Sequence, residues 1–231
     1  MRAMLLAAGV GTRLRPLTNT VPKCLVPINS KPLLEIWLER LTQAGIGPFL
    51  VNTHYLAEQV DAFIETSSYR GMLRLVNELE LQGTAGTLIA NLDFFQGGDG
   101  MLIHADNYCM ADFSIFQQAH TKRPSECVMT MMTFRTDTPS SCGIVELNDQ
   151  GVVIGFHEKV ANPPGNLANG AVYILSGELL EIIKNELCHM KDFSTEVLHR
   201  FVGRIFTYET ADIFLDIGTP ENYEKANGLF K

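Results

Sequence analysis

The sequence has few cysteines and no paired cysteine motif. Its 231 residues include five cysteines, none of which forms a CxxC pair. An odd number of scattered cysteines argues against a disulfide framework and against a structural zinc site of the usual spacing. The composition therefore favours a reducing compartment, and we expect a cytoplasmic protein.

The sequence also lacks a long apolar run and any linker. The N-terminus passes from Met1-Arg2 into a short apolar stretch that ends at Gly9, which is too short for a secretion signal or a membrane span. There is no internal repeat, no low-complexity segment and no Gly/Ser linker. We therefore expect one soluble domain over residues 1–231 with no membrane partner.

Positive charge is in deficit over the chain as a whole. The 18 basic residues stand against 26 acidic ones, a formal net charge of −8. Nucleic acids and anionic membrane surfaces require a basic field, so we expect neither as a partner. The first 34 residues reverse this balance, because they contain no acidic residue and five cations: Arg2, Arg13, Arg15, Lys23 and Lys31. Phosphate groups are expected to bind there.

Hydrophobic residues are abundant, and their pattern predicts an α/β fold. Buried strands are predicted at 3–8, 49–52, 73–76 and 101–104, with helices at 32–45, 56–66, 83–92 and 111–120. Strands that alternate with helices predict a Rossmann-like, mostly parallel sheet flanked by helices. After Pro124 the predicted strands at 127–134, 143–147, 152–156 and 171–175 have short connections, which indicates antiparallel or mixed additions. Helices are predicted at 177–187, at 194–201 and from Pro220 onwards.

The first predicted strand leads into a glycine loop, Gly9-Val10-Gly11-Thr12-Arg13-Leu14-Arg15-Pro16-Leu17-Thr18, which is followed by Pro22-Lys23. Glycines allow backbone N–H groups to approach phosphate oxygens closely. The loop has no GK[ST] of a P-loop, and Leu14 replaces the third glycine of a dinucleotide fingerprint. Pro16 would break the helix that a dinucleotide loop opens. A surface turn with solvated cations is the alternative to a phosphate cradle.

This spacing of Gly9, Gly11, Thr12-Arg13-Leu14, Pro16-Leu17-Thr18 and Pro22-Lys23 resembles the signature of the sugar-1-phosphate nucleotidyltransferases, over the whole chain. The resemblance implies a GT-A-like architecture and catalytic contacts from Arg13 and Lys23 to the triphosphate and the reacting α-phosphate. It assigns base, ribose and phosphate binding to the loop residues Ala7, Ala8, Gly9, Gly11 and Thr12. Ala7-Ala8 departs from many relatives, which have a further glycine there.

Two aspartates follow apolar runs at distant positions. Asp106 follows the strand predicted at 101–104, and Asp216 lies in Phe214-Leu215-Asp216-Ile217-Gly218. Each alone is typical of a turn or a helix cap. The resemblance implies that both are catalytic and hold Mg²⁺ between the phosphates of the two substrates, as suits a hard cation with oxygen ligands. The neighbouring His104 and Cys109 are interpreted as structural.

The sugar end of the site is expected in the second half of the chain. Phe156-His157-Glu158-Lys159 and Asn169-Gly170-Ala171 resemble family motifs, which implies that Glu158 binds sugar hydroxyls, Lys159 the sugar phosphate and Asn169 the sugar. Gly143 is predicted to give a backbone contact. An exposed, solvated Glu-Lys pair is the alternative.

The segment from Asn77 to Leu88 occupies the base-binding stretch that the resemblance implies. Its Gly83-Thr84-Ala85-Gly86 core is similar to mannose-1-phosphate and heptose-1-phosphate guanylyltransferases. Gly83 and Thr84 are therefore predicted to bind nucleotide. Glu78 is the candidate that recognises guanine, because a carboxylate accepts from both N1–H and N2–H₂.

The expected reaction transfers a nucleotidyl group from a nucleoside triphosphate, favouring GTP, to a mannose-type or heptose-type sugar 1-phosphate. Uridylyl or thymidylyl transfer to another sugar is the alternative, and a catalytically silent regulatory homologue is a second one, against which the intact catalytic residues argue. No β-helix domain is expected after the last helix, and a homodimer is left open.

Overall fold

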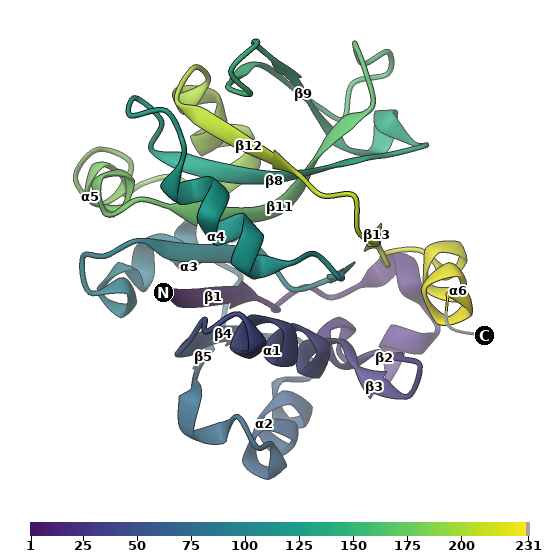
Figure 1. The fold of residues 1–231 in the computed structure, drawn as a ribbon. Coiled ribbons are helices and arrows are strands. Elements are labelled where there is room, and N and C mark those ends of the chain that lie inside the picture. The colour runs from purple at the N-terminus through teal and green to yellow at the C-terminus, as the bar shows by residue number, and fades with distance from the viewer. Residues whose placement is uncertain (230–231) are drawn as a thin grey trace. The chain divides into compact units, whose positions relative to one another are not determined.

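The structure is a computed structural model that describes residues 1–229. The chain divides into two compact units (Figure 1). The first contains Met1–Leu81, Ile103–Phe113 and the segment from Asp212 onwards, and the second contains Gln82–Leu102 and Ser114–Ala211. The expectation of one domain over residues 1–231 stays a prediction.

Parallel strands form the centre of the first unit. β1 (Arg2–Leu6), β4 (Phe49–Thr53) and β5 (Leu73–Asn77) pair in parallel, with Ala3 opposite Phe49 and Phe49 opposite Leu73. β4 is buried along its whole length, as expected of a parallel strand covered on both faces. These strands were all predicted, as was β6 (Gly100–His104), whose end leads into the first unit.

The helices of the first unit follow the predicted apolar periodicity. α1 (Leu33–Gln43) buries Leu34, Trp37, Leu38 and Leu41, and each such side chain contributes about 1.5–3 kcal/mol through removal from water. The Trp37 indole Nε1 donates to the carbonyl oxygen of Asn107 at 2.9 Å. α1 thereby anchors the segment that follows β6. α2 (Ala57–Thr66) buries Val60 and Ile64.

Short elements that the sequence did not predict complete this unit. β7 (Asn107–Cys109) pairs antiparallel with β13 (Phe214–Asp216), and β2 (Pro27–Ile28) pairs with β3 (Lys31–Pro32). α6 (Pro220–Gly228) begins at the predicted proline and lies beside β13 and β2 (Figure 1). Single turns of 3₁₀ helix occupy η1 (Thr12–Leu14), η2 (Leu17–Asn19), η3 (Lys23–Leu25) and η4 (Arg70–Met72).

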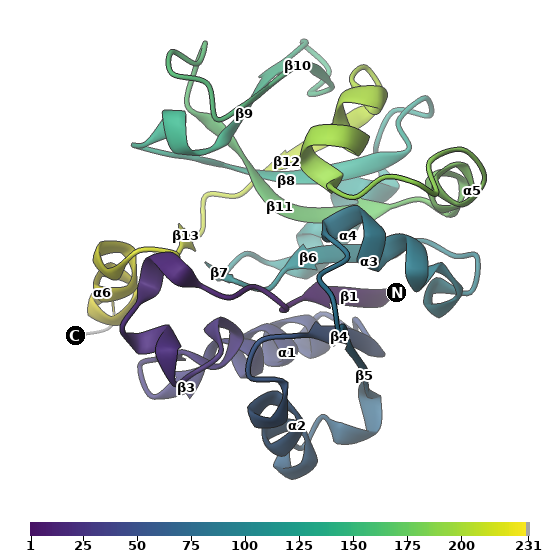
Figure 2. The ribbon, with the colours of Figure 1, turned by 180° about the vertical axis from the view of Figure 1, so that it is seen from behind.

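The second unit contains the predicted mixed additions. β10 (Val153–Glu158), β9 (Gly143–Leu147), β11 (Leu167–Leu175) and β8 (Met129–Arg135) pair antiparallel in that order, and β12 (Ile205–Glu209) adds in parallel beside β8 (Figure 2). The helical segments are α3 (Thr84–Ala90), η5 (Leu92–Phe95), α4 (Phe113–Thr121), which begins at the unit boundary, η6 (Pro139–Ser141) and α5 (Gly177–Glu186).

Two predictions in this unit need correction, and one strand was missed. β11 begins at Leu167 rather than at 171, because the pairing with β8 continues through an irregularity between Asn169 and Tyr173. The helix expected at 194–201 is a π turn, η7 (Phe193–Val197), followed by a 3₁₀ turn, η8 (Leu198–Phe201). β12 was not predicted at all.

The predicted fold class is confirmed: the chain forms a mixed, mostly parallel sheet with flanking helices. Within residues 1–229, no helix has the length and apolar character needed to cross a membrane.

Candidate active site

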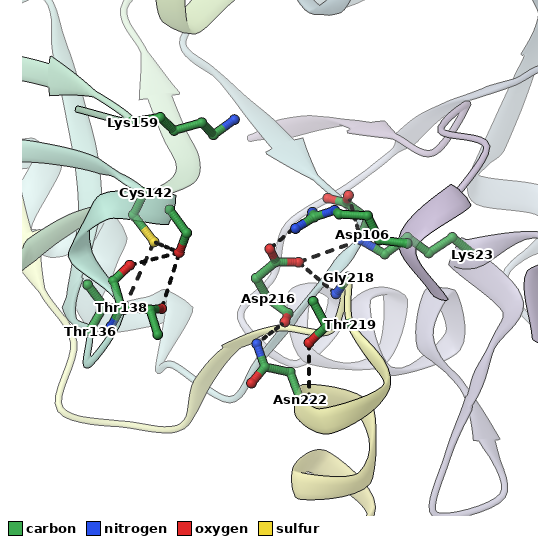
Figure 3. Close-up of polar contacts among 12 residues, drawn as sticks. Lys23, Asp106, Thr136, Thr138, Cys142, Lys159, Asp216, Gly218, Thr219 and Asn222 are labelled. Carbon is green, nitrogen blue, oxygen red and sulfur yellow. Dashed lines mark hydrogen bonds and ion pairs between the residues drawn. The ribbon is translucent and has the colours of Figure 1, made fainter. Parts of the chain in front are cut away.

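A cluster of two cations and two carboxylates lies in the first unit. The Lys23 ammonium lies 2.8 Å from Asp106 Oδ2 and 3.7 Å from Asp216 Oδ1, and Arg13 Nη2 lies 3.4 Å from Asp216 Oδ2. Figure 3 shows Lys23 turned toward both carboxylates. Lys23 is 4% exposed, whereas the two aspartate side chains are 41% and 42% exposed. The structure therefore brings together all four residues that were predicted to be catalytic.

Backbone pairing places the two carboxylates side by side. Asp106 follows β6, where the N–H of Ala105 donates to the carbonyl oxygen of Leu6 at 3.0 Å. In the β7–β13 ladder, Asp216 is directly opposite Asn107, the residue after Asp106. Two residues 110 positions apart in the sequence therefore become neighbours through a ladder of only three residue pairs.

The environment of Asp106 favours its ionised form. Burial raises the pKa of the Asp106 carboxyl, but the attraction of the Lys23 ammonium, together with nearby His104, outweighs it and brings the pKa below its ordinary value.

The neighbouring Cys109 is 2% exposed, and burial raises its pKa to about 12. A protonated, buried thiol is a poor nucleophile and a poor metal ligand, which fits its interpretation as a packing residue.

Asp216 is held by the turn that leads into α6. Its Oδ1 accepts from the N–H of Gly218 at 2.8 Å, and its carbonyl oxygen accepts from Asn222 Nδ2 at 2.8 Å (Figure 3). Thr219 caps α6 by accepting from the N–H of Asn222 at 3.3 Å. The carboxylate therefore has a defined orientation toward Lys23 before any ligand binds.

Gly218 provides a test of this orientation. A Cβ at position 218 would lie 2.6 Å from Arg13 Nη2 and 2.8 Å from Asp216 Oδ1, so both groups must move. We expect Gly218→Ala to lower kcat by about tenfold or more with little change in the melting temperature, because the displaced groups are at the surface. Gly228→Ala, where a Cβ meets nothing within 4 Å, is the control. Equal kcat values for the two variants would show that Asp216 tolerates displacement.

The glycine loop leaves the sheet after β1. Ala7 and Ala8 are buried, whereas Gly9 and Thr12 are exposed. Gly11 has a φ of +66°, a conformation that favours glycine, and its carbonyl oxygen accepts from Thr18 Oγ1 at 2.7 Å. A hydrogen bond from the buried Thr18 therefore holds the loop at Gly11, while Gly9 and Thr12 are exposed. The binding roles predicted for these residues stay predictions.

Glu78, the predicted guanine ligand, has an environment that the sequence did not suggest. It is 3% exposed, and its Oε1 accepts from Asn52 Nδ2 at 2.9 Å. The carboxylate is therefore directed into the protein toward another side chain. Recognition of guanine by Glu78 stays a prediction, and the geometry favours a supporting role.

Gly83 and Thr84 begin α3 in the second unit. The Thr84 hydroxyl accepts from the N–H of Phe193 at 2.7 Å, and the carbonyl oxygen of Lys191 accepts from the N–H of Ala85 at 2.9 Å. These two hydrogen bonds hold the start of α3 against Lys191 and the first residue of η7. A nucleotide role for Gly83 and Thr84 stays a prediction.

The predicted sugar-binding residues lie on three neighbouring strands of the second unit, except Lys159, which directly follows β10. Gly143 on β9 is paired with Glu158 on β10, and Lys159 Nζ lies 3.3 Å from Glu158 Oε1. Asn169 on β11 donates through Nδ2 to the Tyr173 hydroxyl at 2.7 Å and accepts from the N–H of Ala171 at 2.9 Å. Asn169 thus has a fixed orientation, and Lys159 is 66% exposed and available to an anion.

The position of the Glu158 side chain leaves room only for a glycine at position 143. A Cβ at position 143 would lie 2.5 Å from Glu158 Oε2 and 2.8 Å from Phe156 Cζ. We expect Gly143→Ala to displace Glu158 and raise the KM for sugar 1-phosphate about tenfold while the KM for the nucleotide stays unchanged. Gly165→Ala, where nothing lies within 4 Å, serves as the control. An equal rise in both KM values would remove Glu158 from the sugar site.

The donor set of the cluster fits a divalent magnesium ion. Asp106 and Asp216 are half-exposed carboxylates that share the cation Lys23, so both face a common point. Among residues 1–229 no group of three or more potential ligand side chains gathers to hold a metal. Two carboxylates match the way Mg²⁺ is usually held, with phosphates and water completing the coordination.

Two residues that hold predicted site residues, one in each unit, were missed in the sequence. Asn52, the next-to-last residue of β4, forms hydrogen bonds both with Glu78 and with the N–H of Ala7. Tyr173 is fully buried and holds Asn169. The asparagine at the end of the strand predicted at 49–52 was a signal that could have been used, because a polar residue is unusual in a buried apolar run. Nothing in the sequence around Tyr173 distinguishes it from an aromatic residue that only packs in the core.

Comparison with known proteins identifies the family of this chain. A model of the nucleotidyl transferase family matches residues 2–230. The chain belongs to this family. The chain is 27% identical to D-glycero-alpha-D-manno-heptose 1-phosphate guanylyltransferase of Campylobacter jejuni, over 96% of this chain and 97% of that protein. It is 26% identical to mannose-1-phosphate guanyltransferase 2 of Candida glabrata, over 100% of this chain but 64% of that protein.

The names of the relatives do not all refer to the same nucleotide. The chain is 32% identical to glucose-1-phosphate thymidylyltransferase of Streptomyces griseus, over 79% of this chain and 51% of that protein. Among solved structures, HddC from Yersinia pseudotuberculosis complexed with GMP-PN aligns with a TM-score of 0.83 at 26% identity, covering 100% of this chain and 99% of that chain. Family membership therefore leaves the base and the sugar open.

Proposed function

We propose that this chain joins a nucleoside triphosphate to a sugar 1-phosphate and releases pyrophosphate. The observation that carries the proposal is the cluster in which Lys23 lies between Asp106 and Asp216, with Arg13 beside it. The cluster adjoins the glycine loop in sequence, and the chain belongs to the nucleotidyl transferase family.

The chemistry requires positioning and charge rather than a covalent intermediate. A phosphate oxygen of the sugar 1-phosphate attacks the α-phosphorus, a new P–O bond forms, and the bond from the α-phosphorus to the bridging oxygen of the β-phosphate breaks. Negative charge builds on the phosphoryl oxygens, and preplaced cations stabilise it. Lys23 and Arg13 are such cations, because carboxylates already fix the orientation of both.

Mg²⁺ is the proposed cofactor, held by Asp106 and Asp216. A bound Mg²⁺ neutralises phosphate charge and aligns the reacting groups. The loop residues Ala7, Ala8, Gly9, Gly11 and Thr12, together with Gly83 and Thr84, are proposed to bind the nucleotide. Glu158, Lys159, Asn169 and the backbone of Gly143 are proposed to bind the sugar 1-phosphate.

For the substrates we propose GTP and a mannose-type or heptose-type sugar 1-phosphate. Support comes from the Gly83-Thr84-Ala85-Gly86 core and from the guanylyltransferase names of the Campylobacter and Candida relatives. The thymidylyltransferase from Streptomyces supports the competing assignment. We retain the cytoplasmic location as part of the proposal, with a homodimer left open.

A substrate panel tests the proposal directly. Pyrophosphate release is measured with GTP, UTP, dTTP and ATP, each against the 1-phosphates of mannose, heptose, glucose and an N-acetyl sugar. We expect release that requires Mg²⁺ and has its highest kcat/KM with GTP. A preference for UTP or dTTP would overturn the guanylyl assignment, and no release with any pair would overturn the transferase assignment.

A further inference from the structure

The carboxyl ends of three neighbouring parallel strands are joined by a buried hydrogen-bond relay. In the β1–β4 ladder Leu6 is opposite Asn52, and the next residue, Ala7, donates its N–H to Asn52 Oδ1 at 2.7 Å. Asn52 Nδ2 then donates to Glu78 Oε1 at 2.9 Å, directly after β5. Asn52 and Glu78 are each 3% exposed. The relay therefore runs inside the protein from the glycine loop to Glu78.

The chemistry of the three groups fixes the direction of the relay. The backbone N–H of Ala7 can only donate, so the amide oxygen of Asn52 must face it. The amide nitrogen of Asn52 then faces Glu78 Oε1, which accepts its N–H. The contact with Glu78 Oε1 therefore holds the Asn52 amide in the orientation that the Ala7 N–H requires.

The Glu78 end of the relay is anchored to the backbone of β4. The N–H of Glu78 donates to the carbonyl oxygen of Thr53 at 2.8 Å, and His54 Nδ1 donates to the carbonyl oxygen of Glu78 at 2.7 Å. At the other end, Ala7 is the residue at which the chain leaves β1 for the loop. The hydrogen bond from Ala7 to Asn52 therefore holds the first residue of the loop at the place where the chain leaves β1.

We propose that Glu78 and Asn52 are positioning residues, which hold the loop Ala7–Thr12 in its nucleotide-binding conformation. The proposal rests on the proposed function for the role of that loop. In it, Glu78 acts through Asn52 and does not contact the base. The two roles of Glu78 differ in one measurable way: a residue that contacts guanine changes the ratio of affinities between nucleotides, whereas a positioning residue changes all affinities by the same factor.

The test uses Glu78→Ala, Asn52→Ala and Glu78→Gln, with Glu58→Gln as the control at an exposed carboxylate of the same unit. Affinities for GTP, UTP and dTTP are measured by calorimetry, and amide hydrogen exchange at Ala7 is measured by NMR. We expect both alanine variants to weaken all three nucleotides about tenfold and to speed exchange at Ala7. Glu78→Gln retains an oxygen acceptor for Asn52 and should stay near the wild type, as should the control.

Two results would overturn the proposal. One is a Glu78→Gln variant whose GTP-to-UTP affinity ratio collapses while exchange at Ala7 stays slow. The other is a folded Asn52→Ala variant with unchanged exchange and unchanged nucleotide affinity. Glu78→Gln preserves side-chain volume, so it decides between the two roles even where an alanine variant does not fold. Amide hydrogen exchange at Ala7 can be measured without turnover. If no pyrophosphate were released, that result would contradict the proposed function and would leave the positioning role of Glu78 and Asn52 to be decided by the exchange measurement.

Discussion

Asp106→Asn and Asp216→Asn are each expected to lower kcat about a hundredfold or more while the fold stays intact. Each substitution removes one of two carboxylates that face the Lys23 ammonium, and a neutral amide is a weak ligand for Mg²⁺. Both side chains are about two-fifths exposed, so the amide is hydrated without disturbing the core. The loss in turnover should therefore be the larger effect. Asp106→Asn should also lower the free energy of unfolding, because it removes the 2.8 Å partner of the buried Lys23 ammonium.

Pyrophosphate release at saturating substrates, measured as Mg²⁺ is titrated, checks this expectation. Both variants should require more Mg²⁺ for their residual rate than the wild type. Asp61→Asn, at an exposed aspartate of α2, is the matched control and should behave as the wild type. A wild-type rate and a wild-type Mg²⁺ requirement in either active-site variant would remove that aspartate from the metal site.

The local parts of the site could be predicted from the sequence. The glycine loop and Lys23 lie within one short segment, and Asp106 follows an apolar run long enough to be recognised as a strand. Each of these signals depends on neighbouring residues alone. The helices α1 and α2 were predicted for the same reason, since their 3.6-residue periodicity is present in the sequence itself.

Non-local features could not be predicted in the same way. Asp216 reaches Asp106 through the β7–β13 ladder, whose strands have only three residues each, too few for a period of two to be visible. The resemblance to a family supplied this pairing, and the residue pattern alone did not.

Glu78 shows a second limit of sequence-based inference. A glutamate after a strand is usually solvated. Glu78 was a candidate for contact with guanine because it lies in the base-binding stretch that the resemblance implies and because a carboxylate accepts from N1–H and N2–H₂. Burial depends on Asn52 of the adjacent strand, which turns the carboxylate inward. Periodicity describes which face of an element is apolar, but it does not say which polar side chain will find a buried partner.

Lys23→Gln is the second substitution with a large expected effect, because it alters both rate and stability. Lys23 is 4% exposed and is the cation shared by Asp106 and Asp216. Its removal takes one preplaced charge from the phosphoryl oxygens, which typically costs about a hundredfold or more in rate. It also leaves two carboxylates close together without their shared ammonium group, although Arg13 remains 3.4 Å from Asp216.

The loss of this shared cation should lower the free energy of unfolding. Breaking a fully buried pair costs about 3–5 kcal/mol, and the partial exposure of both aspartates reduces this to about 1–3 kcal/mol through solvent screening. For a chain of this length each kcal/mol corresponds to roughly 2–4 °C. The melting temperature of Lys23→Gln should therefore fall by roughly 2–12 °C in the absence of divalent cations.

Mg²⁺ distinguishes this explanation from a simple packing defect. A cation that binds the folded state alone stabilises it in proportion to the logarithm of its concentration over Kd. With Lys23 absent, the two carboxylates no longer share a competing cation, so Mg²⁺ should raise the melting temperature of Lys23→Gln more than that of the wild type. Lys225→Gln, at an exposed lysine of α6, should show neither the loss nor the enhanced response. A destabilised Lys23→Gln variant that Mg²⁺ does not recover would show that Lys23 supports packing and that the two aspartates do not form a metal site.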